Sequence, residues 1–148
     1  MREASSPYPD SSFLVSLLIQ DAHTAQAGRI MSNLNAPLCV TPLHRHEVRS
    51  AIHQAVFRGE MEKKDRQAVF LQFDDDMRAG FFAHTTVPWT ATFQEASRLG
   101  ELFVEDLGTR GVDVLHVSIA ISLGKSTIVT FDKRQGRLAE KAGLQWIH

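Results

Sequence analysis

The chain has 148 residues, of which 43% are hydrophobic and 22% are charged, so it is long enough for one folded domain and too apolar for a disordered chain. The 16 Lys and Arg residues are balanced by 17 Asp and Glu residues, and the net charge of −1 excludes strong binding to nucleic acid through net charge alone. A single cysteine, Cys39, excludes an intramolecular disulfide and favours a reducing compartment. We expect one domain over residues 1–148.

The first part of the chain predicts helices separated by short strands. Residues 1–9 are polar and carry two prolines, which fits either a tail or a short strand near Tyr8 that ends at Asp10. Thr41 followed by Pro42 has the order expected for an N-cap and a first helical position. The sequence indicates helices over 11–18 and 22–34, a strand over 38–41, helices over 43–58 and 60–79, and a candidate strand over 81–87.

The second part predicts a buried helix and a buried strand. Residues 112–123 are apolar on most faces, which indicates a helix buried on two sides, and residues 126–131 form a run typical of a parallel strand. The expected elements are helices over 91–107 and 112–123, a strand over 126–131, a helix over 133–142 and a strand over 144–147. Short strands separated by helices indicate an α/β domain with a mainly parallel sheet.

The sequence contains no signal for membrane insertion or export. The longest apolar run near the start, residues 13–19, is interrupted by Ser16 and is too short to span a bilayer. No basic segment followed by an apolar run and a small-residue cleavage site opens the chain. We therefore expect a cytoplasmic protein.

Four carboxylates fall at the ends of predicted elements, where open α/β sheets gather their chemistry. Asp10 follows the first candidate strand, and Glu47 lies early in the helix after the second strand. Asp113 lies in the first turn of the buried helix, and Asp132 directly follows the strand before the last helix. Each has an ordinary structural explanation, such as a helix cap or a solvated side chain. Four converging carboxylates would repel one another unless a cation compensates, and Mg²⁺ or Mn²⁺ suits such a cluster.

Four segments resemble the PIN domain family, and within it the VapC-type toxins and related small PIN nucleases. They are YPDSSFLVSLL at 8–18, TPLHRHEVR at 41–49, DVLHVSIA at 113–120 and VTFDKRQ at 129–135. The last two segments are the most specific, and the resemblance spans residues 8–147. One departure lies in the first strand, where two prolines weaken a strand that is usually apolar.

The resemblance implies a three-layer α/β/α sandwich and a Mg²⁺- or Mn²⁺-dependent ribonuclease. It assigns catalysis and metal binding to Asp10, Glu47, Asp113 and Asp132. Ser12 matches a small polar residue of the family and is a candidate contact to a phosphate or to a water held by the metal. The resemblance also implies a toxin with a cognate antitoxin protein, and a homodimer. A partner peptide would lie over the helices of 11–34 and 43–79, with a basic side chain reaching the carboxylates, unless the apolar faces of these helices are buried within the dimer or the core.

Basic residues near two of the acids are candidates for contacts to RNA phosphates. Arg45 precedes Glu47, and Lys133 and Arg134 follow Asp132, although all three equally fit a solvated surface. His116 follows Asp113 by about one turn, where it would orient that acid or a phosphate, or simply be a buried histidine with a satisfied hydrogen bond.

Two other functions fit the sequence less well than a ribonuclease. A PIN-like module that mainly binds a partner protein, with little or no nuclease activity, is the first alternative. A phosphotransfer domain is the second, but Asp10 is followed by two serines and lacks the second acid that such sites usually carry.

Overall fold

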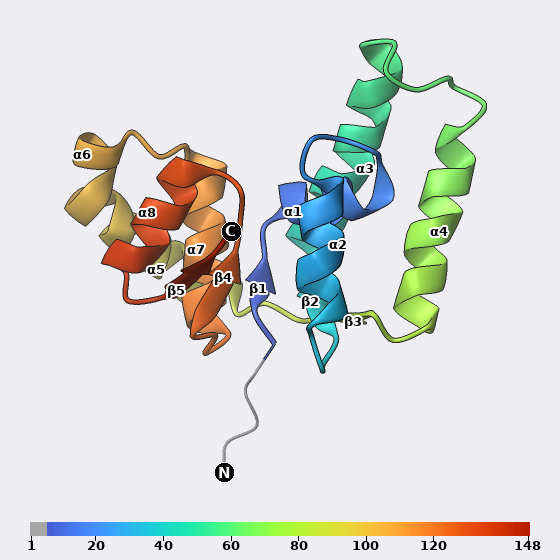
Figure 1. Cartoon of the computed structure of the whole chain (residues 1–148). Helices are drawn as coiled ribbons and strands as arrows, with labels where there is room; N and C mark the ends of the chain where they lie inside the picture. Colours follow the sequence, from blue (N-terminus) through green and yellow to red (C-terminus); the bar gives the residue numbers. More distant parts are fainter. Residues whose placement is uncertain (1–5) are drawn as a thin grey trace. The chain divides into compact units, whose positions relative to one another are not determined.

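The computed structural model describes residues 6–148, so part of the N-terminal segment for which the sequence fits a tail or a strand lies outside the described residues. Its backbone forms two compact units: the first contains residues 6–10 together with Thr86–His148, and the second is Ser11–Thr85 (Figure 1). Every strand pair in both units is parallel. This confirms the predicted PIN-like α/β fold class with parallel strands.

The first unit contains a three-stranded sheet in the order β1-β4-β5, formed by β1 (Tyr8–Pro9), β4 (Thr127–Val129) and β5 (Gln145–Ile147). β1 is an edge strand of this sheet and is only two residues long, as its prolines suggested. Its pairing with β4 continues through the Asp10 N–H, which donates to the Val129 carbonyl at 2.8 Å. The ladder therefore tolerates Pro9 and still fixes the backbone of Asp10.

The helices of the first unit are α5 (Trp89–Leu99), α6 (Glu105–Leu107), α7 (Gly111–Ser122) and α8 (Lys133–Lys141). α7 is buried along most of its length, as predicted from its apolar faces. The single helix predicted over 91–107 is wrong in its second half, where a π-helix, η1 (Gly100–Val104), separates α5 from α6. Gly100, a weak helix former, stands at the point where the α-helical hydrogen-bond pattern changes.

Close packing of α8 against β5 depends on a glycine. A Cβ atom built on Gly136 would lie 2.1 Å from the ring of Trp146, a distance that no side chain can occupy. The Trp146 indole N–H donates to the Thr130 carbonyl at 2.8 Å, so the ring is held in place at both ends. This contact positions the helix that follows Asp132, and it makes Trp146 a packing residue.

We expect Gly136→Ala to destabilise the protein by about 1–3 kcal/mol, the usual cost of overpacking a tight site. The free energy of unfolding, measured in urea, checks this value. Gly28→Ala in α2 (Thr24–Ser32) is the matched control, because nothing lies within 4 Å of its added Cβ and alanine favours a helix. Equal stabilities of the two variants would contradict the close-packing argument.

The second unit contains α1 (Ser11–Leu18), α2, α3 (Pro42–Phe57) and α4 (Arg66–Arg78), with β2 (Leu38–Val40) paired to β3 (Phe82–His84). Thr41 caps α3 as predicted: its hydroxyl accepts from the His44 N–H, and the His44 ring accepts from the Thr41 N–H. The predicted starts of two helices are wrong. α2 begins at Thr24 rather than at residue 22, and α4 begins at Arg66 rather than at residue 60, because residues 59–65 form a polar turn after Gly59.

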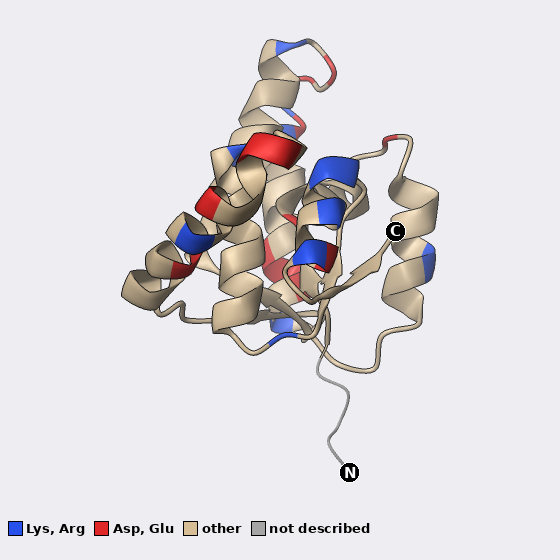
Figure 2. Ribbon diagram, turned by 90° about the vertical axis from the view of Figure 1, so that its left-hand side faces the viewer, with Lys and Arg blue, Asp and Glu red and all other residues tan. Residues whose placement is uncertain are grey.

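Both units carry acidic and basic residues, in keeping with the near-neutral charge of the chain (Figure 2). None of the helices within residues 6–148 is both long enough and apolar enough to cross a membrane.

Candidate active site

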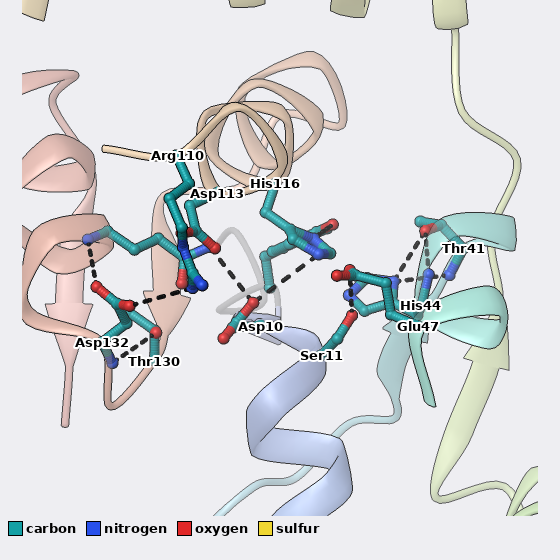
Figure 3. A network of polar contacts seen from close by, with 12 residues as sticks. Asp10, Ser11, Thr41, His44, Glu47, Arg110, Asp113, His116, Thr130 and Asp132 are labelled. Atoms are coloured by element: carbon teal, nitrogen blue, oxygen red, sulfur yellow. Dashed lines mark hydrogen bonds and ion pairs between the residues drawn. The ribbon is translucent and has the colours of Figure 1, made fainter. Parts of the chain in front are cut away.

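Asp10 stands at the end of β1 and is almost completely buried, with 6% of its surface exposed. Its Oδ1 accepts from the side-chain amide of Gln135 at 3.4 Å and lies 3.8 Å from Nε2 of His116 (Figure 3). The Tyr8 hydroxyl lies 2.6 Å from the other ring nitrogen of His116. Asp10 is therefore held in place through its backbone and through neighbours on α7 and α8.

Asp132 caps a helix with one carboxylate oxygen and directs the other toward Arg110. It is the N-cap of α8, and its Oδ1 accepts from the backbone N–H groups of Arg134 and Gln135 at 2.8 and 3.0 Å. Its own N–H donates to the Thr130 hydroxyl at 3.1 Å. The ordinary explanation of Asp132 as a helix cap is thus correct, but it uses only one oxygen. The second oxygen, Oδ2, lies 3.7 Å from Nη2 of Arg110.

Asp113 is buried in the first turn of α7, as the sequence predicted. Its Oδ2 accepts from Nε of Arg110 at 2.9 Å. Arg110 is the N-cap residue of the same helix, so the pair is separated by three positions. A single guanidinium therefore spans the carboxylates of Asp113 and Asp132 (Figure 3).

Burial raises the pKa of the Asp113 carboxyl above its ordinary value, and the negative charges of Asp10 and Asp132 raise it further. The hydrogen bond and positive charge of Arg110 act in the opposite direction and lower it. The pKa of Arg110 is raised chiefly by Asp113, with smaller effects of the two other acids. The three carboxylates therefore share one electrostatic environment, in which the anionic form of Asp113 is disfavoured.

Two residues of this cluster were not singled out from the sequence. Arg110 precedes the predicted helix over 112–123, and its spacing of three from Asp113 is a recognisable ion-pair signal. Gln135 carries no charge and gave no signal at all. His116 is a buried histidine with a hydrogen bond, as the simpler interpretation held, and the acid it approaches is Asp10.

The fourth predicted acid, Glu47, belongs to the second unit. Its Oε1 accepts from the Ser11 hydroxyl at 2.8 Å, and Ser11 is the residue that follows Asp10 in the chain. Ser12 is exposed and lines, together with Glu47, a cavity of about 300 Å³ in that unit. The convergence of all four acids stays a prediction.

The basic residues proposed to bind phosphate lie in different surroundings. Lys133 and Arg134 are exposed and line a cavity of about 400 Å³ together with Arg110 and Asp132. Arg45 belongs to the second unit, where it lies 3.8 Å from Asp74 and near the ring of Phe73. The first pair adjoins the carboxylates, and Arg45 is engaged by an acid on α4.

Comparison with protein families gives one match that covers most of the chain. The model of the PIN domain matches residues 8–141, a span that includes both units and all four predicted acids. The chain belongs to the PIN domain family. No curated protein matches the sequence. PIN domains are in general metal-dependent nucleases that typically use divalent ions, so the match supports a nuclease-type function.

The carboxylate groups of this PIN domain are of the chemical type that binds divalent cations. Asp10, Asp113 and Asp132 offer hard oxygen ligands in one electrostatic environment, the type that Mg²⁺ and Mn²⁺ prefer. Oε1 of the fully buried Gln135 has no hydrogen-bond partner among residues 6–148, and an added water or ion would satisfy it. Within those residues, however, no three acidic, His or Cys side chains are arranged to hold a metal ion. Two of the acids are instead paired with Arg110.

Proposed function

We propose that this PIN domain is a Mg²⁺- or Mn²⁺-dependent ribonuclease. The observation that supports it best is that Arg110 pairs with both Asp113 and Asp132 and that the charge of Asp10 acts on this pair, in a chain whose family match spans residues 8–141. No protein nucleophile is needed for such a reaction, because water is the attacking group.

Each residue of the cluster has a definite task in this proposal. Asp10, Asp113 and Asp132 hold the cation, with Glu47 as the fourth ligand and Ser12 near it. When bound, a divalent cation stabilises charge on the phosphate and activates water for in-line attack. Gln135 keeps Asp10 oriented, and the burial of Asp10 and Asp113 excludes bulk water from their carboxylates. Lys133 and Arg134, exposed beside Asp132, bind RNA phosphates.

The toxin assignment goes further than the family membership. We propose a toxin of a toxin–antitoxin pair that acts in the cytoplasm as a homodimer and is inhibited by a cognate antitoxin protein. The toxin, antitoxin and homodimer proposals rest on the resemblance of four segments to the VapC-type toxins, and the cytoplasmic location rests on the single cysteine and on the lack of an export signal in the sequence.

Cation-dependent cleavage of RNA tests the proposed function. We expect the full chain, stripped with EDTA, to leave a panel of structured and single-stranded RNAs intact and to cut at least one of them once Mg²⁺ or Mn²⁺ is restored. Cleavage products are measured on denaturing gels.

The control is Asp106→Asn, which removes an exposed acid of α6 in the same unit and should cut at the wild-type rate. A folded protein that cuts none of these RNAs with either cation would contradict the proposal and favour a protein-binding module. Formation of an acyl phosphate would instead identify a phosphotransfer domain.

A further inference from the structure

We propose that Arg110 is an exchangeable internal counterion, which occupies the carboxylates of Asp113 and Asp132 until a divalent cation displaces it. The inference rests on the proposed function, because it concerns the same acids. It adds a residue of this chain that competes with the cation for its ligands.

The geometry places the guanidinium on the oxygens that a cation needs. Nε of Arg110 donates a hydrogen bond to Oδ2 of Asp113 at 2.9 Å, and Nη2 of Arg110 lies 3.7 Å from Oδ2 of Asp132. The other oxygen of Asp132 is already committed to the backbone of α8. Oδ2 is therefore the oxygen of Asp132 for which Arg110 and a bound cation would compete, because interaction with one weakens interaction with the other.

The solvent exposure of the three side chains shows that Arg110, rather than Asp113 or Asp132, can move away when the ion pairs break. The side chain of Arg110 is 74% exposed, whereas those of Asp113 and Asp132 are 11% and 33% exposed. An exposed arginine exchanges its partner for water at little cost, because a surface ion pair contributes only modestly to stability. The carboxylates are fixed in α7 and at the start of α8, so displacement moves the arginine and leaves the acids in place.

The charges of the cluster favour the exchange. The guanidinium contacts the carboxylates of Asp113 and Asp132, and the negative charge of Asp10 also raises the pKa of Arg110. A single positive charge cannot balance three negative ones, and a divalent cation brings twice that charge into a smaller volume. Both cations compete for the same oxygens, so removing Arg110 should strengthen ion binding rather than weaken it.

The test is a titration of the RNA-free full chain with Mn²⁺, followed by isothermal calorimetry and by the signal of free Mn²⁺ in electron paramagnetic resonance. We expect Arg110→Ala and Arg110→Gln to bind Mn²⁺ about two- to fivefold more tightly than the wild type, the range that loss of one surface ion pair allows. The rise in Tm caused by Mn²⁺ should also be larger in these variants. Arg137→Ala is the matched control, because it removes an exposed arginine of α8 and should leave the affinity unchanged.

The outcomes separate this inference from the proposed function. Equal or weaker Mn²⁺ binding by both folded Arg110 variants, in a wild type that binds Mn²⁺, would overturn the counterion role and leave the metal site standing. No Mn²⁺ binding by the wild type or the variants would overturn both. The glutamine variant keeps a shorter, uncharged polar side chain at this position, so a folding defect of the alanine variant does not decide the result.

Discussion

Asp113→Asn is expected to reduce RNA cleavage by about a hundredfold or more while leaving the fold intact. The substitution removes one charged ligand, and metal catalysis is worth several kcal/mol, of which each 1.36 kcal/mol is about tenfold in rate. The amide has the size of the carboxylate, so no cavity forms in the first turn of α7. Cleavage rates in Mg²⁺ and in Mn²⁺ measure the effect, and a wild-type rate would show that Asp113 is not part of the site.

The same variant should be more stable than the wild type at neutral pH. Burial raises the pKa of Asp113 in the folded protein, so its contribution favours folding below the ordinary value of 3.8 and is lost as the pH rises through the folded value. At pH 7 the charged side chain therefore disfavours folding, and asparagine relieves that cost. A gain of about 1 kcal/mol would raise Tm by about 2–4 °C in a chain of this size.

The gain should shrink as the pH is lowered toward the usual pKa of an aspartate, because the wild-type side chain then carries a proton. Asp106→Asn supplies the control, since it removes an exposed acid of the same unit. A lower Tm of Asp113→Asn at pH 7 would contradict the sign derived from burial and from the neighbouring acids.

Because the two oxygens of Asp132 have different roles, we expect Asp132→Asn and Asp132→Ala to differ in their effects on stability but not on RNA cleavage. Asn and Ala should both reduce cleavage by about a hundredfold, because each removes a charged ligand. Asparagine still caps a helix, so Asp132→Asn should stay within about 0.5 kcal/mol of the wild type, whereas Asp132→Ala should lose about 1 kcal/mol with the cap. Urea unfolding and cleavage assays on the same preparations separate the two tasks.

Either half of this prediction can fail by itself. Equal stabilities of the two variants would show that the hydrogen bonds from Arg134 and Gln135 to Oδ1 do not stabilise α8. Full activity of Asp132→Asn would show that the charge on Oδ2 is not needed for cleavage.

The sequence located Asp113 and Asp132 because the elements around them have strong patterns. The apolar faces of residues 112–123 mark α7, and the run at 126–131 marks the strand before α8, so both acids fall at well-defined ends. Asp10 was predicted from a weaker pattern, since the prolines leave only two residues in β1. The position of its backbone depends on a hydrogen bond to Val129, which is remote in sequence.

The sequence did not reveal the neighbours of these acids, because tertiary contacts decide them. Gln135 faces Asp10 only after α8 has packed against β4 and β5, and a neutral side chain carries no charge signal. Helix starts were missed for a similar reason. Residues 60–65 have the composition of a charged helix, but after the left-handed turn at Gly59 they form a polar turn before α4.

The pairing of β1 with β4 also has a consequence for the order of folding during synthesis. Asp10 and Gln135 touch although they are 125 positions apart, whereas every element of the second unit lies within residues 11–85. Chains generally fold from the N-terminus as they emerge, and contacts between distant residues form late. The acidic cluster therefore cannot assemble until the ribosome has released residues up to Gln135, so a growing chain would carry no competent nuclease close to the messenger that encodes it.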